Sequence, residues 1–193
     1  TARARGGLLF LPYQAGQIDA LRSMISTWMR IAIFEALNCS EGDQRLWFVV
    51  DELDALGPID GLKDALARLR KFGGRCVLGM QSISQVRATY GESEARTIVE
   101  NCGNTLILRC SASEGGGTAR FASELLGDRE VIRTQVSRSL RPGEFRATRT
   151  ISQQHVTERA VMASEIEQLA DLRGYLKIAS QPAWLRVGIA GDG

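Results

Sequence analysis

Apolar and polar residues follow one another in blocks that predict strands and helices in turn. Residues 7–13 and 46–50 are short apolar runs without polar alternation, as is typical of strands covered on both faces. Between them, over 14–38, apolar residues recur roughly at helical spacing. A polar loop at 39–45 precedes the second strand. The first quarter of the chain is therefore predicted to be strand, helix, strand.

The same alternation continues through the middle of the chain. Its predicted elements are a helix from about Asp60 to Gly73-Gly74, a strand at 75–80, helices at 82–88 and 92–101, and a strand at 105–109. Strands that alternate with helices are typical of a parallel sheet flanked by helices. We therefore predict an α/β fold with a mostly parallel sheet.

The last third of the chain is more varied. A helix at 118–127 is followed by a polar, Arg-rich segment at 129–155, which we interpret as either an irregular excursion or a long hairpin. A helix at 162–172 and strands at 174–180 and 184–189 close the chain. Basic residues in the polar segment could contact phosphates or another subunit, or serve as ordinary surface residues; they are Arg133, Arg138, Arg141, Arg146 and Arg149.

Composition limits the possible functions. With 193 residues, 44% of them hydrophobic, the chain can bury a core, and its net charge of +2 gives no bulk basicity. The four cysteines show no CxxC pair and the single histidine, His155, has no histidine partner, so zinc or triad chemistry is not expected. We predict reduced, buried cysteines and core positions for Trp28, Trp47 and Trp184. No run approaches the roughly 20 apolar residues of a membrane span, and the abrupt start suggests a piece of a longer protein.

One pair of acids stands out against this background. Asp51 and Glu52 directly follow the apolar strand in WFVVDELDAL, 47–56, which matches the Walker B pattern of P-loop NTPases. Ligands of parallel α/β sheets bind beyond the carboxyl ends of the strands. The alternative is a strand end that leads into an acidic turn. Gln81 ends the next strand, where an amide could sense a phosphate, whereas Arg70 either complements a helix dipole or reaches a neighbouring subunit.

From Asp51 to Gly91 the chain resembles a known family. The stretch VVDELDALGPIDGLKDALARLRKFGGRCVLGMQSISQVRATYG is similar to the motor core of conjugative type IV coupling proteins, the TraD/TraG/TrwB group within the FtsK/HerA clan of hexameric DNA pumps. The similarity continues through NCGNTLILRCSAS, FASELLGDREV and VMASEIEQLADLRGYLKIA, and so covers most of the chain.

The resemblance implies a role for each candidate residue. Asp51 and Glu52 would be Walker B, with Asp51 holding Mg²⁺ through water, Arg70 would be a finger inserted into the adjacent subunit, and Gln81 would be the sensor that meets ATP. It also implies a RecA-like fold, a homo-hexamer, and a place on the cytoplasmic side of the bacterial inner membrane. The implied partners are single- and double-stranded DNA, relaxase or relaxosome proteins, and components of the secretion channel.

The family's phosphate-binding loop is missing from these residues. No G-x-x-x-x-G-K-[ST] occurs, and the glycine-rich stretch at 113–121 lacks the lysine. We interpret residues 1–193 as the C-terminal part of one RecA-like motor domain, inactive alone. Two alternatives to a conjugative DNA pump stay open: a docking module for relaxosome or effector proteins, and a chromosomal FtsK/HerA-like translocase.

Overall fold

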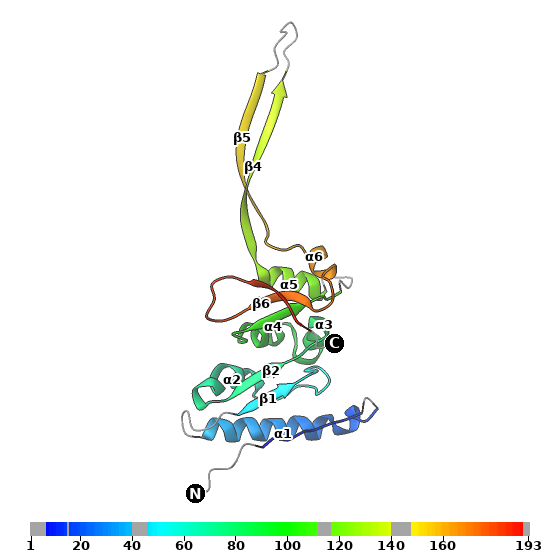
Figure 1. Ribbon diagram of the computed structural model, residues 1–193. Coiled ribbons are helices and arrows are strands. Elements are labelled where there is room, and N and C mark those ends of the chain that lie inside the picture. The colour runs from blue at the N-terminus through cyan, green and yellow to red at the C-terminus, as the bar shows by residue number, and fades with distance from the viewer. Residues whose placement is uncertain (1–6, 15, 40–45, 112–116, 140–147, 191–193) are drawn as a thin grey trace. The chain divides into compact units, whose positions relative to one another are not determined.

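The computed structural model describes residues 7–14, 16–39, 46–111, 117–139 and 148–190. The chain divides into two compact units, Thr1–Asn104 and Thr105–Gly193. Each unit has its own sheet and its own helices. Figure 1 shows the elements along the chain.

Unit 1 is built around a two-stranded parallel sheet. Its elements, in chain order, are α1 (Ile18–Asn38), β1 (Trp47–Val50), α2 (Leu62–Arg68), the 3-10 helix η1 (Leu69–Phe72), β2 (Arg75–Leu78), α3 (Ile83–Tyr90) and α4 (Glu92–Glu100). Strands β1 and β2 pair in parallel, from Trp47 opposite Arg75 to Val50 opposite Leu78. This confirms the predicted strand–helix–strand unit and its parallel pairing.

The described residues of unit 1 cover one face of its sheet. Phe48 and Val50 are buried, whereas Trp47, Val49 and Val77 point to the other face and are 57%, 69% and 47% exposed. Parallel sheets ordinarily bury both faces. Within the described residues of unit 1, no element packs over the second face, so this unit by itself does not give the predicted strand covered on both sides.

Two further expectations for unit 1 are corrected. Residues 7–14 have no regular secondary structure, and Leu8, Leu9 and Phe10 are 75% exposed or more. A strand needs a hydrogen-bonded neighbour, and among the described strands none pairs with this segment. Trp28 is 47% exposed, so neither it nor Trp47 is a core residue.

Unit 2 combines an antiparallel sheet with a long ribbon. Its elements are β3 (Thr105–Leu108), α5 (Thr118–Leu126), β4 (Asp128–Ser139), β5 (Thr148–Arg159), α6 (Ala163–Glu167), β6 (Arg173–Lys177) and β7 (Leu185–Gly188). The sheet has the order β3-β6-β7 and is antiparallel throughout. The α/β class is thus confirmed, but among the described strands the parallel pairing is restricted to β1 and β2.

A small apolar core joins the helices of unit 2 to its sheet. Ile107 on β3 packs with Ala119, Ala122 and Leu126 of α5 and with Ile166 and Leu169 around α6, while Tyr175 and Trp184 lie at its margin. The predicted helix at 162–172 is only five residues long in the structure. Leu172 adopts a φ of 57°, which a right-handed helix cannot contain.

The sequence predicts either an irregular excursion or a long hairpin for the polar segment at 129–155. The structure shows the hairpin, which is formed by strands β4 and β5. They pair over twelve residues each, from Asp128 opposite Arg159 to Ser139 opposite Thr148 (Figure 1). Arg141 and Arg146 lie outside the described residues, as do the side chains of Arg138 and Arg149.

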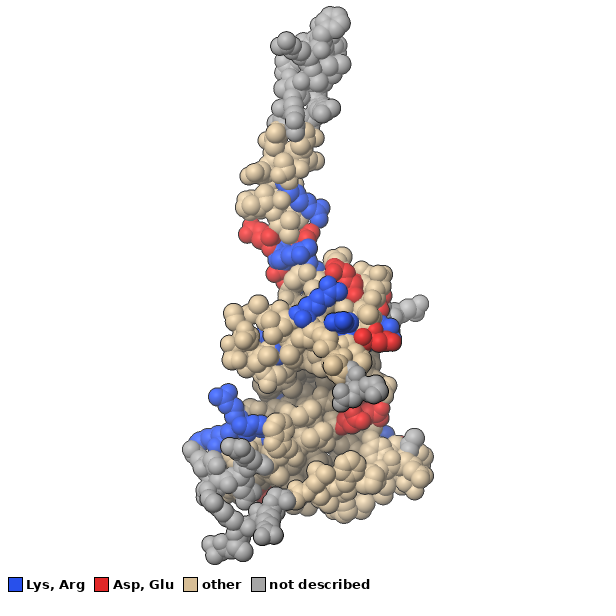
Figure 2. All heavy atoms as spheres, in the orientation of Figure 1, with Lys and Arg blue, Asp and Glu red and all other residues tan. Residues whose placement is uncertain are grey.

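Opposite charges gather at the base of this ribbon. Glu158 accepts hydrogen bonds from Arg129 at 2.9 Å and from Arg133 at 2.8 Å. Asp128 pairs with Arg159 at 2.9 Å. Figure 2 shows these acidic and basic side chains intermixed along the base of the ribbon. Hydrogen bonds from the two arginines lower the pKa of Glu158 from its ordinary value.

The cysteines follow expectation in part. All four are unpaired and half-buried rather than fully buried, and burial raises the pKa of Cys76 to about 11. Among the described helices, none is long and apolar enough to cross a bilayer.

Candidate nucleotide-hydrolysis site

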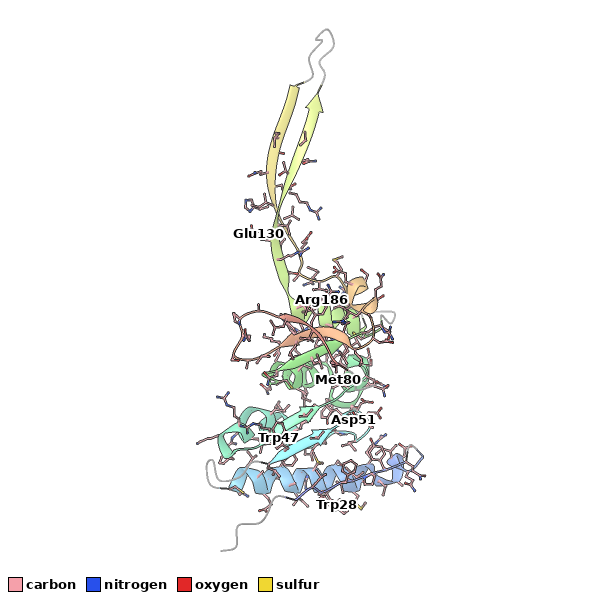
Figure 3. The ribbon with its side chains drawn as sticks, viewed as in Figure 1. Trp28, Trp47, Asp51, Met80, Glu130 and Arg186 are labelled. Carbon is pink, nitrogen blue, oxygen red and sulfur yellow. The ribbon has the colours of Figure 1, made fainter. Side chains whose placement is uncertain are left out.

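The candidate site begins where β1 and β2 end. Asp51 and Glu52 follow β1, and Gly79, Met80 and Gln81 follow β2. Because the two strands are parallel, both ends lie at one edge of the sheet. Figure 3 shows Asp51 beyond one end of β1, with Trp47 at the opposite end, and Met80 on the Asp51 side.

The side chains of Glu52 and Gln81 meet at this edge. Nε2 of Gln81 donates a hydrogen bond to Oε1 of Glu52. Asp51 and Gln81 are exposed, and Glu52 is half-buried. The structure therefore brings together three of the four residues that the sequence singled out, with their polar groups open to solvent.

A close backbone approach holds this arrangement. The N–H of Gly79 donates to the carbonyl of Val50 at 2.7 Å, and the N–H of Leu53 donates to the carbonyl of Gly79 at 3.0 Å. A Cβ on residue 79 would lie 2.1 Å from the carbonyl oxygen of Asp51. Only glycine, which has no Cβ, permits the two backbones to come this close. The backbone at Gly79 therefore lies directly against the backbone of Asp51, the first acid of the pair.

Side chains of two helices, α1 and α3, form hydrogen bonds to the loop that follows the acids. The Tyr90 hydroxyl at the end of α3 accepts the N–H of Ile59 at 3.3 Å and donates to the carbonyl of Gly57 at 3.2 Å. Nε of Arg22 on α1 donates to the carbonyl of Ala55 at 3.0 Å. These hydrogen bonds connect segment 53–61 to α1 and α3, which limits how far Asp51 and Glu52 can move.

Two more polar residues lie near the acids. Burial raises the pKa of Tyr13, and the negative charges of Glu52, Asp51 and Asp54 raise it further. The Oδ1 atom of Asp54 is buried without a hydrogen-bond partner among the described residues. The site is therefore acidic, and its field disfavours the addition of another negative charge.

Arg70 lies at the other end of the sheet. It is exposed in η1, which leads through Gly73, a residue with a φ of 81°, into the start of β2. The amino end of β2 faces away from the edge that carries Asp51 and Gln81. Arg70 therefore does not join the other three residues within the chain.

The available groups suit a magnesium ion held mainly by water and phosphate. Mg²⁺ prefers oxygen ligands and is commonly bound by one or two carboxylates, with waters and substrate phosphates filling its octahedron. Asp51 offers an exposed carboxylate. Among the described residues, no group of three or more His, Cys, Asp or Glu side chains could hold a metal without other ligands.

Sequence reasoning missed the residues that support the site. Gly79 could have been found, since a glycine inside a strand end often marks a close backbone approach. Tyr13 and Tyr90 carry no local signal, because their positions near the acids and the loop depend on tertiary packing.

Comparison with known proteins gives a consistent result. The family model described as "Type IV secretion-system coupling protein DNA-binding domain" matches residues 1–189. The chain is 29% identical to "Coupling protein TraD" of Escherichia coli strain K12 over 175 residues, which is 90% of this chain and 24% of TraD. It is 34% identical over 117 residues to VirD4, the "Type IV secretion system-coupling protein" of Bartonella quintana, covering 58% of this chain and 18% of VirD4.

Solved structures of one coupling protein are similar as well. TrwBdeltaN70, a bacterial conjugative coupling protein, in its trigonal form with sulphate, has a TM-score of 0.79 and 32% identity over 97% of this chain and 41% of that one. TrwB in complex with ADP and Mg²⁺ has a TM-score of 0.75 and 32% identity, covering 92% and 38%. The complex with the ATP analogue ADPNP has a TM-score of 0.74 and 31% identity, covering 92% and 38%. The chain spans about a quarter of TraD and about two fifths of the TrwB chains.

Proposed function

The chain belongs to the type IV secretion-system coupling proteins, and we propose that in the whole protein it is the C-terminal part of one RecA-like motor domain that hydrolyses ATP to drive DNA transfer. The hydrogen bond between Gln81 and Glu52 beside Asp51 carries this proposal. The complexes of TrwB with ADPNP and with ADP and Mg²⁺ support it.

Each residue at the sheet edge has a distinct proposed role. The carboxylate of Asp51 would hold Mg²⁺ through water, and the ion would supply neutralisation of phosphate charge. Glu52 orients and polarises the attacking water. Gln81 reports on the γ-phosphate and, through its hydrogen bond, keeps the Glu52 carboxylate in place. In this proposal the position of the Glu52 carboxylate therefore depends on the position of the Gln81 side chain.

Arg70 is proposed to act in trans. Its place at the amino end of β2 suits a guanidinium that stabilises phosphate charge in the next subunit of a homo-hexamer. In this proposal the whole protein works at the bacterial inner membrane with its motor on the cytoplasmic side. Single- and double-stranded DNA, relaxase or relaxosome proteins and the secretion channel would be its partners.

Substitution of Glu52 tests the hydrolytic role. In the full-length protein, Glu52→Gln should abolish ATP turnover while ATP still binds, because the amide cannot polarise water but leaves Asp51 intact. Glu94→Gln, on the exposed side of α4, is the control and should turn over normally. Steady-state phosphate release and nucleotide titration measure the two quantities. Normal turnover in Glu52→Gln would refute the assignment and favour a docking module.

Mixed hexamers test the role in trans. Subunits with Arg70→Ala and subunits with Glu52→Gln are each expected to be inactive, yet some interfaces of a mixed ring would combine an intact Glu52 with an intact Arg70. Mixing should therefore restore part of the ATPase rate. Arg68→Ala, which removes an exposed arginine two residues earlier, should leave the rate unchanged. If mixing restores nothing, Arg70 does not act across the interface.

A further inference from the structure

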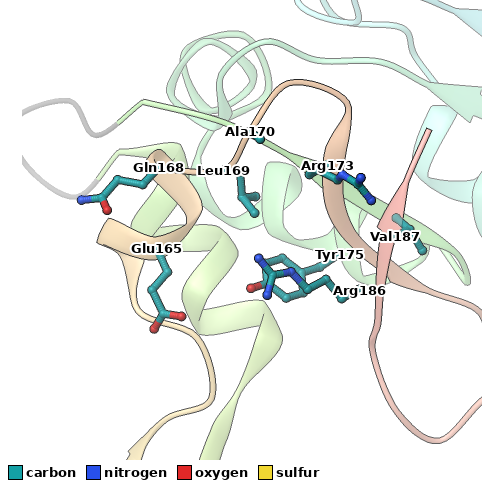
Figure 4. Close-up of a pocket in the computed structure, with 8 residues that line it drawn as sticks. All are labelled: Glu165, Gln168, Leu169, Ala170, Arg173, Tyr175, Arg186 and Val187. Carbon is teal, nitrogen blue, oxygen red and sulfur yellow. The ribbon is translucent and has the colours of Figure 1, made fainter. Parts of the chain in front are cut away.

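Unit 2 contains a cavity with no role in the proposed hydrolysis. Its volume is roughly 650 Å³, and it lies between α6 with the turn that follows it and strands β6 and β7 (Figure 4). Leu169, only 5% exposed, forms part of an apolar wall. The polar lining comes from Glu165, Gln168, Arg173, Tyr175 and Arg186. The volume falls within the range of ligand sites.

Strand register places the two arginines beside the tyrosine. Tyr175 stands opposite Arg186, and Arg173 stands opposite Gly188. Facing residues of an antiparallel pair, and residues two apart on one strand, lie on the same face of a sheet. Figure 4 shows Tyr175 and Arg186 side by side within the cavity. Two guanidinium groups and one phenol therefore border a single hollow.

Gly188 leaves space for one of these guanidinium groups. A Cβ at position 188 would come within 2.4 Å of Nη1 of Arg173. The Arg173 side chain therefore lies over the backbone of β7 at Gly188, the residue opposite Arg173, which has no side chain. A larger residue there would push the guanidinium away from its present place beside the cavity.

The two arginines have no acidic partner among the described residues. Other arginines of unit 2 do have one, for example Arg109 with Asp171 at 2.6 Å and Arg159 with Asp128 at 2.9 Å. The nearest acid in the lining, Glu165, accepts the N–H of Met162 at 3.1 Å. The cavity thus presents two arginines without acidic partners among the described residues, one beside Tyr175 and the other over Gly188 (Figure 4), and each guanidinium can donate hydrogen bonds to a planar anion.

We propose that this cavity binds a carboxylate of an acidic peptide segment from a partner protein. Arg186 would donate hydrogen bonds to the carboxylate beside Tyr175, and Arg173 would add positive charge at the other end of the cavity. Leu169 would contact an adjacent apolar side chain. A peptide suits the mixed lining better than a nucleic acid, because Glu165 repels a continuous row of phosphates. Gln168 can in addition pair with either polar group of a peptide backbone.

Calorimetric titration of the full-length protein with short synthetic peptides tests the proposal. One probe carries Asp and Glu between phenylalanines and has both ends blocked, a second carries only a free C-terminal carboxylate, and a third has every acid replaced by its amide. At least one acidic probe should bind, more weakly at high salt, and the amide probe should not. The first two probes distinguish a side-chain carboxylate from a chain terminus.

Substitutions locate the binding. Arg186→Ala should weaken binding of the acidic probe by about tenfold or more, and Arg173→Ala, which removes charge at the other end of the cavity, should weaken it by less. Arg186→Lys, which keeps the charge, should weaken it less. Arg120→Ala removes an exposed arginine of α5 outside the cavity and is the matched control, with unchanged affinity expected. Circular dichroism establishes that each variant is folded.

Three results would overturn the proposal. The first is equal affinity for acidic and amide probes, and the second is unchanged binding by folded Arg173→Ala and Arg186→Ala. The third is tight binding of a thymidine trinucleotide that depends on the same two arginines and excludes the peptide, which would assign the cavity to nucleic acid instead.

Discussion

A methyl group at position 79 should disrupt the site more than its size suggests. In Gly79→Ala the new Cβ would lie 2.1 Å from the Asp51 carbonyl oxygen, whereas ordinary contact begins near 3.4 Å. The two backbones would have to separate by about 1.3 Å, the difference between those distances. No side-chain rotation can relieve the clash, because both atoms are fixed to the main chain.

The structure gives the scale of the effect. Separation would break or lengthen the hydrogen bonds from Gly79 to Val50 and from Leu53 to Gly79, each worth about 1 kcal/mol net. Overpacking in a tight region costs a further ~1–3 kcal/mol. We expect unit 1 to lose about 3–5 kcal/mol of stability if both hydrogen bonds break. The acids would also move relative to Gln81, so the full-length protein should lose ATPase activity.

Urea unfolding followed by tryptophan fluorescence measures the loss of stability, and hydrogen exchange at the Leu53 amide locates it. Gly16→Ala is the control, since a Cβ there would meet nothing within 4 Å, and it should change stability little. If Gly79→Ala unfolds like the parent chain and the Leu53 amide stays equally protected, the close approach does not exist in solution.

Two other polar contacts give predictions that depend on pH. Burial raises the pKa of Tyr90 to about 12, so its contribution to stability is complete below its ordinary pKa of 10 and is lost as pH rises through about 12. Tyr90→Phe should remove this alkaline step from a titration of tyrosine absorbance and should lower the free energy of unfolding by about 1–2 kcal/mol. A titration curve identical to that of the parent chain would contradict this prediction. The pKa of Glu158 is lowered, so the ribbon's base should be fully formed above the ordinary value of 4.5 and should loosen as pH falls through the lower, folded value. Carboxyl chemical shifts measure this, and Glu158→Gln should abolish the dependence; loosening at the ordinary pKa would count against the contacts with Arg129 and Arg133.

Much of the site could be predicted because its signals are local. An apolar strand followed by Asp51 and Glu52, and another followed by Gln81, place these side chains at one edge as soon as the strands pair in parallel. The hydrogen bond between Glu52 and Gln81 follows from that geometry. The roles of these residues, and that of Arg70, stay predictions until the substitutions above are made.

The errors share a physical cause. The strand expected at 7–13 and the buried positions expected for Trp28 and Trp47 rested on apolar composition alone. Burial, however, requires a partner surface, and the described residues do not supply one. Antiparallel pairing of β3 with β6 was missed because alternation of elements does not specify how strands that are distant in sequence meet.

The position of the ion pairs in the β4–β5 ribbon bears on how the protein can vary in length. Among the described side chains, its charged contacts lie between Asp128 and Arg133 on one strand and between His155 and Arg159 on the other. Beyond them, the facing pair Thr134 and Gln153 is polar and the facing pair Val136 and Ile151 is apolar; both pairs are exposed and are joined by the backbone ladder. Removal of facing residues in pairs beside Ser139 and Thr148 would keep the register of all pairs between there and Asp128. The ribbon can therefore gain or lose length at its far end through insertions and deletions, while its attachment to the rest of unit 2 stays the same.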